Sequence, residues 1–311
     1  MKRILKGIAV NVDIGVALLL SILVGLLDIA GVASASLIDG AIILTLAALA
    51  AGMLHNRLSG ESGSSKVEKQ LSGWFGNEAV KLLKGAEIAQ ELTEARRNSD
   101  SWEFKGGTGI YNRAVTLPEL AEKSRRDRRP HSVSLEILDP TDIDLCRRYD
   151  EFFAGVVTSS ADTWKVNESG DGTRRQLFAT ILAACWYQNK CSLLEVDVRL
   201  SATMSILRWD LSPDRLIISH REPRYPALLI RTDNQYFSIW KSELHVSRRQ
   251  AKRVPIELAQ QAFLDDRPHV AEVRKLFNNL GIELPGEYSD DAVGQIIDMS
   301  LDQPDPYGSV H

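Results

Sequence analysis

The sequence predicts an α/β protein in which a mixed sheet with helices on both faces follows an N-terminal two-helix transmembrane hairpin. Two apolar stretches, residues 14–32 and 37–54, predict the hairpin, because each is close to the roughly 20 residues that a helix needs to cross a bilayer. From residue 101 onward, strand-like and helix-like patterns alternate. That order is typical of a sheet packed between helices. The charges around the hairpin predict that this domain is cytosolic.

Charge around the apolar stretches predicts their orientation. Basic residues lie before the first stretch and after the second, and none lies between the two: Lys2, Arg3, Lys6, Arg57 and Lys66. The positive-inside rule then places both termini in the cytoplasm, as in a multi-pass protein of the bacterial inner (cell) membrane. The alternative is a signal peptide cleaved near Ala33-Ser34-Ala35. Residues 37–54 would still hold such a chain in the membrane.

Small residues recur four apart on both apolar stretches. Such faces let helices approach closely, either within one hairpin or between the hairpins of a homo-oligomer. Asp28 and Asp39 lie near the predicted outer interface. There they are either solvated or gathered into rings by an oligomer, and the sequence leaves both alternatives open.

Bulk composition limits the chemistry of the chain. The net charge of −4 argues against a generic nucleic-acid binder. Cys146, Cys185 and Cys191 have no paired spacing, which argues against a disulfide framework or a zinc site. The six histidines are scattered. We therefore expect no metal and no cofactor.

Beyond the hairpin, the chain predicts a connector, a sheet domain and a tail. Residues 56–65 are polar and rich in Gly and Ser, which is typical of a linker, and apolar residues then recur at helical spacing to residue 97. The predicted divisions are a hairpin over 1–58, a linker and connector helix over 59–97, an α/β domain over 98–289, and an acidic flexible tail over 290–311.

Within the α/β domain, alternating and β-branched segments predict seven strands: 101–105, 132–138, 193–200, 205–210, 216–220, 227–232 and 236–239. A tight turn at Asp233-Asn234 joins the last two of these strands. Helical segments are predicted from residue 117, over 141–153 and 173–188, from residue 242, and near 269–279. Thr116 is the expected N-cap of the first helix, with Pro118 in its first turn.

Two blocks of this domain resemble phospholipase D-like domains. They are SWEFKGGTG with the following TLPELAEKSRRDRRPHSVSLEILDP, and EVDVRLSATMSILRWDLSPDRLIISH with PALLIRTDNQYFSIWKSEL. The resemblance implies a phospholipase D-like sheet, but the catalytic HxKxxxxD is missing, and ILRWDLSPD stands at 206–214 in its place. That chemistry needs a histidine nucleophile and a lysine on the phosphate. We therefore expect no catalysis by this route.

The predicted hairpin and the domain without its catalytic motif together resemble the two-transmembrane effectors of bacterial anti-phage systems, of the CBASS and Panoptes types. This resemblance implies a non-enzymatic membrane effector in anti-phage defence. Its cytosolic domain would bind a nucleotide-type ligand, cyclic by the same resemblance, and would control oligomerisation and membrane disruption or pore formation. The expected partners are that ligand, the lipid bilayer and a homo-oligomer, and no nucleic-acid polymer. The alternative is a membrane-anchored phosphodiesterase or phospholipase D-like enzyme with a rearranged site.

Phosphate ligands are held where cations and backbone N–H groups converge, and three places in the sequence fit that description. The first is the glycine-rich loop after the predicted strand 101–105, unless it is a plain turn. The second is a basic pair in the first turn of helix 173–188, unless a nearby carboxylate pairs with it. The third lies on the later strands, where an aromatic side chain either stacks on a base or belongs to the core. The candidate ligand-binding residues are Lys105, Gly106, Gly107, Thr108 and Arg113 for the first place, Arg174 and Arg175 for the second, and Arg208, Trp209 and Arg231 for the third, where Arg221 is the alternative to Arg231 and Tyr225 the alternative to Trp209.

Overall fold

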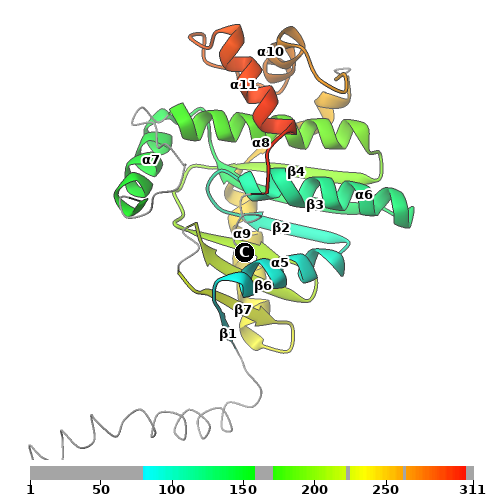
Figure 1. Ribbon diagram of the computed structural model, residues 1–311, viewed down its shortest axis with the longest axis vertical. Coiled ribbons are helices and arrows are strands. Elements are labelled where there is room, and N and C mark those ends of the chain that lie inside the picture. The colour runs from blue at the N-terminus through cyan, green and yellow to red at the C-terminus, as the bar shows by residue number, and fades with distance from the viewer. Residues whose placement is uncertain (1–79, 158–170, 222–224, 262–263, 306–311) are drawn as a thin grey trace, which may run out of the picture. The chain divides into compact units, whose positions relative to one another are not determined.

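The computed structural model describes residues 80–157, 171–221, 225–261 and 264–305 (Figure 1). The chain divides into two units, residues 1–78 and 79–311, and every described residue belongs to the second. That second unit is an α/β fold built on a mixed sheet.

The sheet has eight strands among the described residues, in the order β1-β7-β6-β5-β2-β3-β4-β8. The strands β2, β3 and β4 run parallel, and every other neighbouring pair is antiparallel. In chain order the strands are β1 (Lys81–Leu83), β2 (Ser101–Lys105), β3 (His131–Leu138), β4 (Leu194–Ser201), β5 (Leu207–Leu211), β6 (Arg215–His220), β7 (Ala227–Arg231) and β8 (Lys252–Val254).

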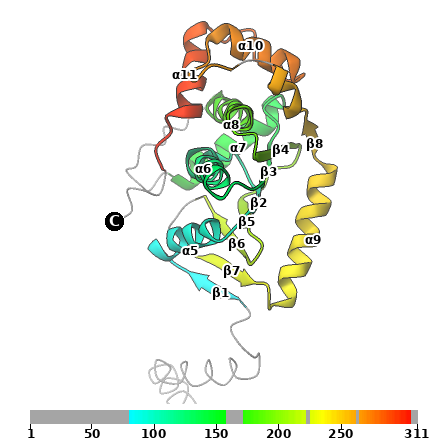
Figure 2. The same cartoon turned by 90° about the vertical axis from the view of Figure 1, so that its right-hand side faces the viewer.

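Helices cover the two faces of this sheet unequally. Figure 2 shows α5, α6 and α8 on one side, which we call the helix face, and α9 alone on the other, which we call the α9 face. The α-helices are α5 (Ala86–Arg97), α6 (Leu117–Asp127), α7 (Ile143–Val157), α8 (Asp171–Lys190), α9 (Gln235–Gln250), α10 (Val270–Asn279) and α11 (Asp290–Leu301). A π-helix, η1 (Asn112–Thr116), precedes α6, and a 3-10 helix, η2 (Ile256–Gln261), follows β8.

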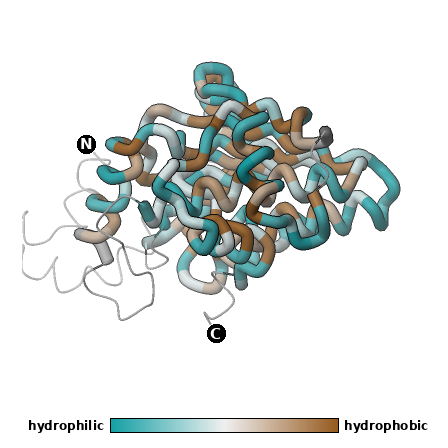
Figure 3. Tube along the Cα trace, turned by 90° about the horizontal axis from the view of Figure 1, so that it is seen from above, coloured by the Kyte–Doolittle hydropathy of each residue, from teal (hydrophilic) through white to brown (hydrophobic). Residues whose placement is uncertain are grey.

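Alternation along the central strands places the main core on the helix face. Trp102, Phe104 and Leu135 point to that face, where each is at most 6% exposed. Helix α8 lies over them, and its middle is buried on every side from Leu177 to Cys185. Figure 3 shows apolar segments running through the interior of the unit, with polar segments at its outer bends. Burial of these large side chains supplies most of the stability of the fold.

The same strands carry charged and polar side chains on the α9 face. Arg248 of α9 donates to Ser134 Oγ at 2.9 Å and lies 3.4 Å from a carboxylate oxygen of Asp197. Ser247 donates to Glu136 Oε1 at 2.7 Å. Helix α9 is therefore held over the parallel strands chiefly by ion pairs and hydrogen bonds. A smaller apolar cluster holds it over the antiparallel strands: Leu211, Leu216, Ile218, Ile230, Phe237 and Leu244.

The predicted fold class requires a correction at its N-terminal part. Over residues 80–305, in the ranges that the structure describes, no helix is long and apolar enough to cross a membrane. The predicted spans, 14–32 and 37–54, lie outside the described residues, as does the predicted linker. Hydropathy measures a preference for any apolar surroundings and does not by itself distinguish lipid from a protein core. The transmembrane hairpin and the inner-membrane localisation are therefore withdrawn.

The predicted strand 236–239 is wrong, because these residues form the first turn of α9. Asn234 is the N-cap of that helix, and its side chain accepts a hydrogen bond from the Tyr236 backbone N–H at 2.8 Å. The Asp233-Asn234 pair thus begins a helix where we predicted a hairpin turn. A good N-cap outweighs the modest β-propensity of the aromatic residues that follow it.

The domain boundaries also differ from their prediction where the structure describes them. In the predicted connector, β1 pairs with β7, and α5 buries Ile88 and Leu92, so residues 81–97 belong to the α/β unit. In the predicted flexible tail, residues 290–301 form α11, which Ser289 caps. Apolar residues at helical spacing within an acidic segment explain both the helix and its burial.

Helix α6 begins at Leu117 with Thr116 before it, as expected, but the expected capping by the Thr116 side chain is not formed. Thr116 has helical backbone angles and makes no capping hydrogen bond with its side chain. The helical path instead begins upstream, in the π-helix η1.

Candidate anion-binding site

The loop after β2 needs glycine at Gly106 and Gly107, because neighbouring side chains pack directly against its backbone. A Cβ atom added to Gly107 would lie 2.0 Å from the Tyr149 hydroxyl oxygen, and one on Gly106 would lie 3.2 Å from Arg208 Cβ. The Gly106 N–H donates to the Glu136 carbonyl at 3.0 Å, so this amide extends the sheet. The predicted cradle of bare N–H groups is therefore not formed at Gly106. The glycines instead let Tyr149 and Arg208 approach the backbone.

Arg208 on β5 is the candidate cation that lies beside this loop. Its guanidinium lies over the Phe104 ring at 5.7 Å and over the Tyr111 ring at 5.1 Å, which places it on the helix face. Asp210 lies two residues on, on the same face, and accepts from Arg208 Nε at 3.0 Å. Burial raises the pKa of Asp210, and the charge of Arg208 opposes that rise.

A second arginine, Arg221, follows β6 at the same end of the sheet. Its guanidinium lies 5.0 Å from the Phe153 ring centre and 5.7 Å from that of Tyr149. Burial raises the pKa of Tyr149, and the charges of Arg221 and Arg208 both oppose it. Tyr149 is therefore a neutral hydroxyl between two cations, beside Gly107.

Ser219 lies between the two arginines. It is the cross-strand partner of Arg208 and precedes Arg221 by two residues, so all three side chains point to the helix face. Ser219 is 3% exposed, and its hydroxyl makes no hydrogen bond among the described residues. Buried hydroxyl groups nearly always have a partner. We use the name arginine–tyrosine cluster for Tyr111, Tyr149, Arg208, Ser219 and Arg221.

Aromatic rings connect this cluster to the surface. The Arg221 guanidinium lies over the Phe153 ring, and this ring lies 5.7 Å from the His220 ring, centre to centre. The His220 ring in turn lies 4.8 Å from the ring of Tyr225. Tyr225 is 54% exposed. A planar ligand group could stack at this rim while its anionic group reached the arginines.

Two of the predicted residues point to the opposite face. Lys105 pairs with Glu136 at 3.2 Å, and its ammonium lies 5.8 Å from the centre of the Trp209 ring. Trp209 packs against Trp240 of α9, at 6.4 Å between ring centres. Lys105 and Trp209 therefore belong to the α9 face and do not join the arginine–tyrosine cluster.

Arg113 is 1% exposed, and its four hydrogen bonds go to uncharged oxygens of Gln176, Thr180 and Gln303. Burial lowers its pKa to about 9. Thr108 is also buried, and its carbonyl accepts from the Thr180 hydroxyl at 2.8 Å. Both residues join η1 and the loop to α8, so their position favours a structural role.

The remaining predicted cations already have partners. Arg175 pairs with Asp171 at 2.7 Å, the alternative that the sequence left open. Arg174 donates to the Pro140 carbonyl at 3.1 Å and lies 3.7 Å from Glu287. Arg231 lies at the end of β7 that pairs with Arg215, at the opposite end of the sheet from the cluster, and is half-exposed.

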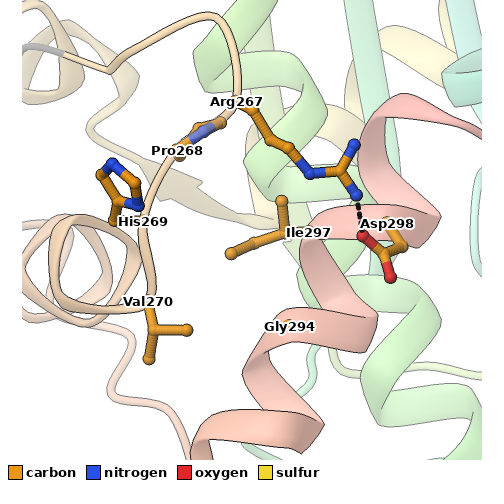
Figure 4. A pocket seen from close by; sticks show the side chains of 7 residues that line it. All are labelled: Arg267, Pro268, His269, Val270, Gly294, Ile297 and Asp298. Carbon is orange, nitrogen blue, oxygen red and sulfur yellow. Dashed lines mark hydrogen bonds and ion pairs between the residues drawn. The ribbon is translucent and has the colours of Figure 1, made fainter.

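A cavity of about 250 Å³ lies away from the cluster, between the start of α10 and α11 (Figure 4). Pro268, Val270 and Ile297 line it, and its one arginine, Arg267, already pairs with Asp298. The lining is mostly apolar and offers little to an anion. Among the described residues, no group of His, Cys, Asp and Glu side chains comes together as metal ligands.

Sequence reasoning found Arg208, Gly106 and Gly107 and named Arg221 as the alternative to Arg231, but it did not select Tyr111, Tyr149 or Ser219. A signal was present in β5 and β6, because Arg208, Asp210 and Ser219 are polar residues inside strands that pair with each other. Tyr149 has no such signal, since only the packing of α7 brings it to the loop.

No family model matches the chain, and no curated protein matches it. Among solved structures, the chain is similar to TrmBL2, which is described as an archaeal chromatin protein with a novel mode of DNA binding. The identity is 9%, and the match covers 68% of this chain and 70% of that chain at a TM-score of 0.31. Similarity at that level carries no argument about what this chain binds.

The expected partners are corrected with these findings. The exclusion of a nucleic-acid polymer rested on net charge alone and is withdrawn, and the similarity to a DNA-binding protein assigns no partner in its place. The lipid bilayer and the homo-oligomer were inferred from the hairpin, and they are withdrawn with it.

Proposed function

We propose that the arginine–tyrosine cluster binds a phosphate-bearing small molecule of the nucleotide class and performs no covalent chemistry on it. The ligand's phosphate would pair with Arg221 and Arg208, and its base would stack near Tyr225. Arginine suits this role because its planar fork of N–H donors matches phosphate oxygens.

The single observation that supports the proposal most is the hydroxyl of Ser219. It is buried between two arginines without a hydrogen-bond partner among the described residues. A phosphate oxygen held by Arg208 and Arg221 would accept from this hydroxyl, which would remove the cost of an unsatisfied buried polar group.

Binding rather than turnover follows from the residue types of the cluster. Its nitrogen groups are guanidinium groups, which stay protonated and do not act as nucleophiles. The resemblance to phospholipase D-like domains would require a histidine followed two residues later by a lysine, and Arg208 stands in that region instead.

A second candidate function is hydrolysis of a phosphodiester with His220 as the reactive group. It is favoured by one observation, that His220 contacts the same Phe153 ring that carries Arg221. This candidate predicts degraded ligand and a complete loss of turnover in His220→Ala. The binding proposal predicts intact ligand with both proteins.

The test is isothermal titration of the full-length chain with pyrophosphate, cyclic di-AMP and cyclic di-GMP. The two cyclic dinucleotides are the first nucleotide probes because each combines phosphate groups with bases that can stack. We expect Arg221→Gln to weaken binding by roughly 10- to 100-fold, the value of a hydrogen bond to a charged group. Ser219→Ala should weaken binding less, because it removes an uncharged donor.

Arg231→Gln is the matched control, since it removes an arginine at the opposite end of the sheet. It should leave the dissociation constant unchanged. If Arg231→Gln and Arg221→Gln weakened binding equally, the effect would come from the change in net charge, and this result would contradict a specific site. Absence of binding by the wild-type chain to all three probes would contradict the proposed function.

A further inference from the structure

Three helices of the helix face end at one edge of the sheet, where the parallel strands β2, β3 and β4 begin (Figure 1). Lys123 of α6 donates to the carbonyl oxygens of Arg97 and Ser99, at 2.7 and 2.6 Å, and so joins the end of α6 to the end of α5. Arg125 donates to the Lys190 carbonyl at 3.0 Å, which joins α6 to the end of α8. The ends of the three helices therefore lie together at this edge.

Exposed arginine side chains gather at this edge of the sheet. We use the name basic edge for these residues: Arg97, Arg125, Arg126, Arg128 and Arg129. Arg126 lies 3.5 Å from Asp127 and is still 69% exposed. Among the described residues, Arg97, Arg128 and Arg129 form no ion pair.

Several other exposed arginines of the described surface have carboxylate partners. Arg147 lies 2.9 Å from Asp144, and Arg253 lies 3.0 Å from Glu257. Such pairs leave little charge for an external anion. The basic edge keeps its charge available, so it can attract an anion even though the whole chain carries a net charge of −4.

The backbone at Arg128 gives a second reason to assign a function to this edge. Arg128 is the C-cap of α6 and has left-handed backbone angles, with φ at 52° and ψ at 39°. Glycine is the usual residue in that conformation at a helix end, because a Cβ atom there costs free energy. Arg125 and Arg126 already place positive charge in the last turn of the helix. The local fold therefore does not account for a further arginine at position 128.

The surroundings of the basic edge fit a phosphate backbone better than other polyanions. Arginine matches phosphate oxygens through its planar fork of N–H donors. A protein that lies on a membrane surface usually adds exposed apolar side chains to its cations, and a binder of single strands adds aromatic ones. The helix ends that form this edge carry none of the large apolar or aromatic side chains that are exposed in the described residues. A double-stranded nucleic acid offers closely spaced phosphates to such a surface.

We propose that the basic edge binds the phosphate backbone of a double-stranded nucleic acid without reading its base sequence. This surface is separate from the arginine–tyrosine cluster, because the cluster lies beside the loop after β2, whereas the basic edge lies where β2 begins. Each arginine of the edge would neutralise one phosphate. The logarithm of the association constant should then fall with the logarithm of the salt concentration, with a slope of about −3 to −5.

The experiment is a fluorescence anisotropy titration of a labelled DNA duplex of about 20 base pairs with the full-length protein, between about 50 and 200 mM salt. The variants are Arg128→Gly, Arg129→Gln and the matched control Arg249→Gln. Arg249 is also exposed and forms no ion pair among the described residues. It lies at the end of α9 next to β8, which pairs with the carboxyl end of β4. The control therefore removes the same charge at the opposite end of the sheet.

We expect Arg128→Gly and Arg129→Gln each to weaken duplex binding roughly five- to tenfold at about 0.1 M salt and to reduce the salt slope by about 1. Arg249→Gln should leave both values unchanged. Arg128→Gly should unfold at a temperature at least as high as the wild type does, because glycine relieves the left-handed backbone at this position. Weaker binding by this variant would then not come from unfolding.

Three results would overturn the inference. Absence of duplex binding by the wild type at about 50 mM salt would show that the exposed charge has no such partner. Equal affinities of Arg128→Gly, Arg129→Gln and Arg249→Gln would place the contact with the duplex elsewhere. If the wild type bound vesicles of phosphatidylcholine and phosphatidylglycerol more tightly than the duplex, and Arg128→Gly lost that binding, the basic edge would be assigned to lipid headgroups.

Discussion

The two faces of one sheet are built on different principles in this protein. On the helix face, β2, β3 and β4 present Trp102, Phe104 and Leu135 to a continuous apolar core. On the α9 face, the same strands present charged and polar residues that pair with side chains of α9 and β8. Parallel strands are usually apolar on both faces because helices cover both. In this protein the parallel strands still alternate between apolar and polar residues. The reason is that α9 alone covers the α9 face and contacts it through ion pairs and hydrogen bonds.

The comparison shows that charged side chains have different surroundings on the two faces. Charges on the α9 face are largely matched with one another, as with Arg199, Arg248 and Arg253 around Asp197. On the helix face, the arginines of the cluster lie among aromatic rings at the edge of the core. Low polarity there strengthens any charge interaction that a ligand can make.

The largest expected effect on stability comes from removing a large buried side chain from the helix face. Trp102 is 1% exposed, and its indole N–H donates to Asn112 Oδ1 at 3.0 Å. Trp102→Ala should lower the free energy of unfolding by about 3–5 kcal/mol through lost burial and a cavity. Denaturant unfolding of the full-length variant measures this value. If Trp102→Ala lost less free energy of unfolding than Arg248→Ala on the α9 face, the helix face would not be the main source of stability.

The next effect tests the ion pair at the edge of the helix face. Arg208→Gln leaves the buried Asp210 carboxylate without its cation and should cost about 3 kcal/mol at pH 7. Burial already raises the pKa of Asp210, so the folded state holds the proton more tightly than the unfolded state does. As the pH rises from the pKa of Asp210 in the unfolded state to its pKa in the folded state, Asp210 therefore lowers the stability of the fold. Removing Arg208 raises the pKa of Asp210 in the folded state further.

The destabilisation by Arg208→Gln should consequently be smaller at pH 5 than at pH 7, because a lower pH favours the protonated form of Asp210, which needs no cation beside it. Denaturant unfolding at the two pH values measures the difference. Arg208→Gln combined with Asp210→Asn removes the titrating group and should show the same cost at both. An equal cost of the single variant at both pH values would show that Asp210 is not the group that titrates.

A smaller effect should come from the loop where the helix face meets the cluster. Gly107→Ala places a Cβ against the Tyr149 hydroxyl, and the resulting displacement should cost about 2 kcal/mol. Gly286→Ala is the control, since its added Cβ meets no atom within 4 Å. Thermal unfolding of the two variants should separate them clearly. Equal midpoints would mean that Tyr149 moves away from the loop without cost.

The smallest effect is expected on the α9 face. Arg248→Ala removes ion pairs with Glu103 and Asp197 that solvent partly reaches, and it should cost about 1 kcal/mol. Because such pairs are screened, the cost should shrink in 1 M salt, whereas the cost of Trp102→Ala should not. Unfolding at low and high salt makes this comparison. If the cost of Arg248→Ala is the same at low and high salt, the effect comes from lost packing of the aliphatic part of the arginine side chain.

Sequence by itself determined the local elements whose pattern is strong. Residues 101–105 alternate strictly and form β2 at those positions, and the apolar run within 173–188 forms the buried middle of α8. These elements follow from side-chain spacing, which is a property of neighbouring residues. The segment 236–239 failed the same reasoning because one capping residue, Asn234, decides between a turn and a helix start.

Only the tertiary structure decided which cations meet. Lys105 and Arg208 lie on neighbouring strands close to each other, yet the pleat sends Lys105 to Glu136 on the α9 face and Arg208 to Asp210 on the helix face. Tyr149 and Gln303 reach the loop and Arg113 from segments far away in the sequence. Spacing along a chain predicts the direction of a side chain, but the partner at the end of that direction is set by how distant elements pack.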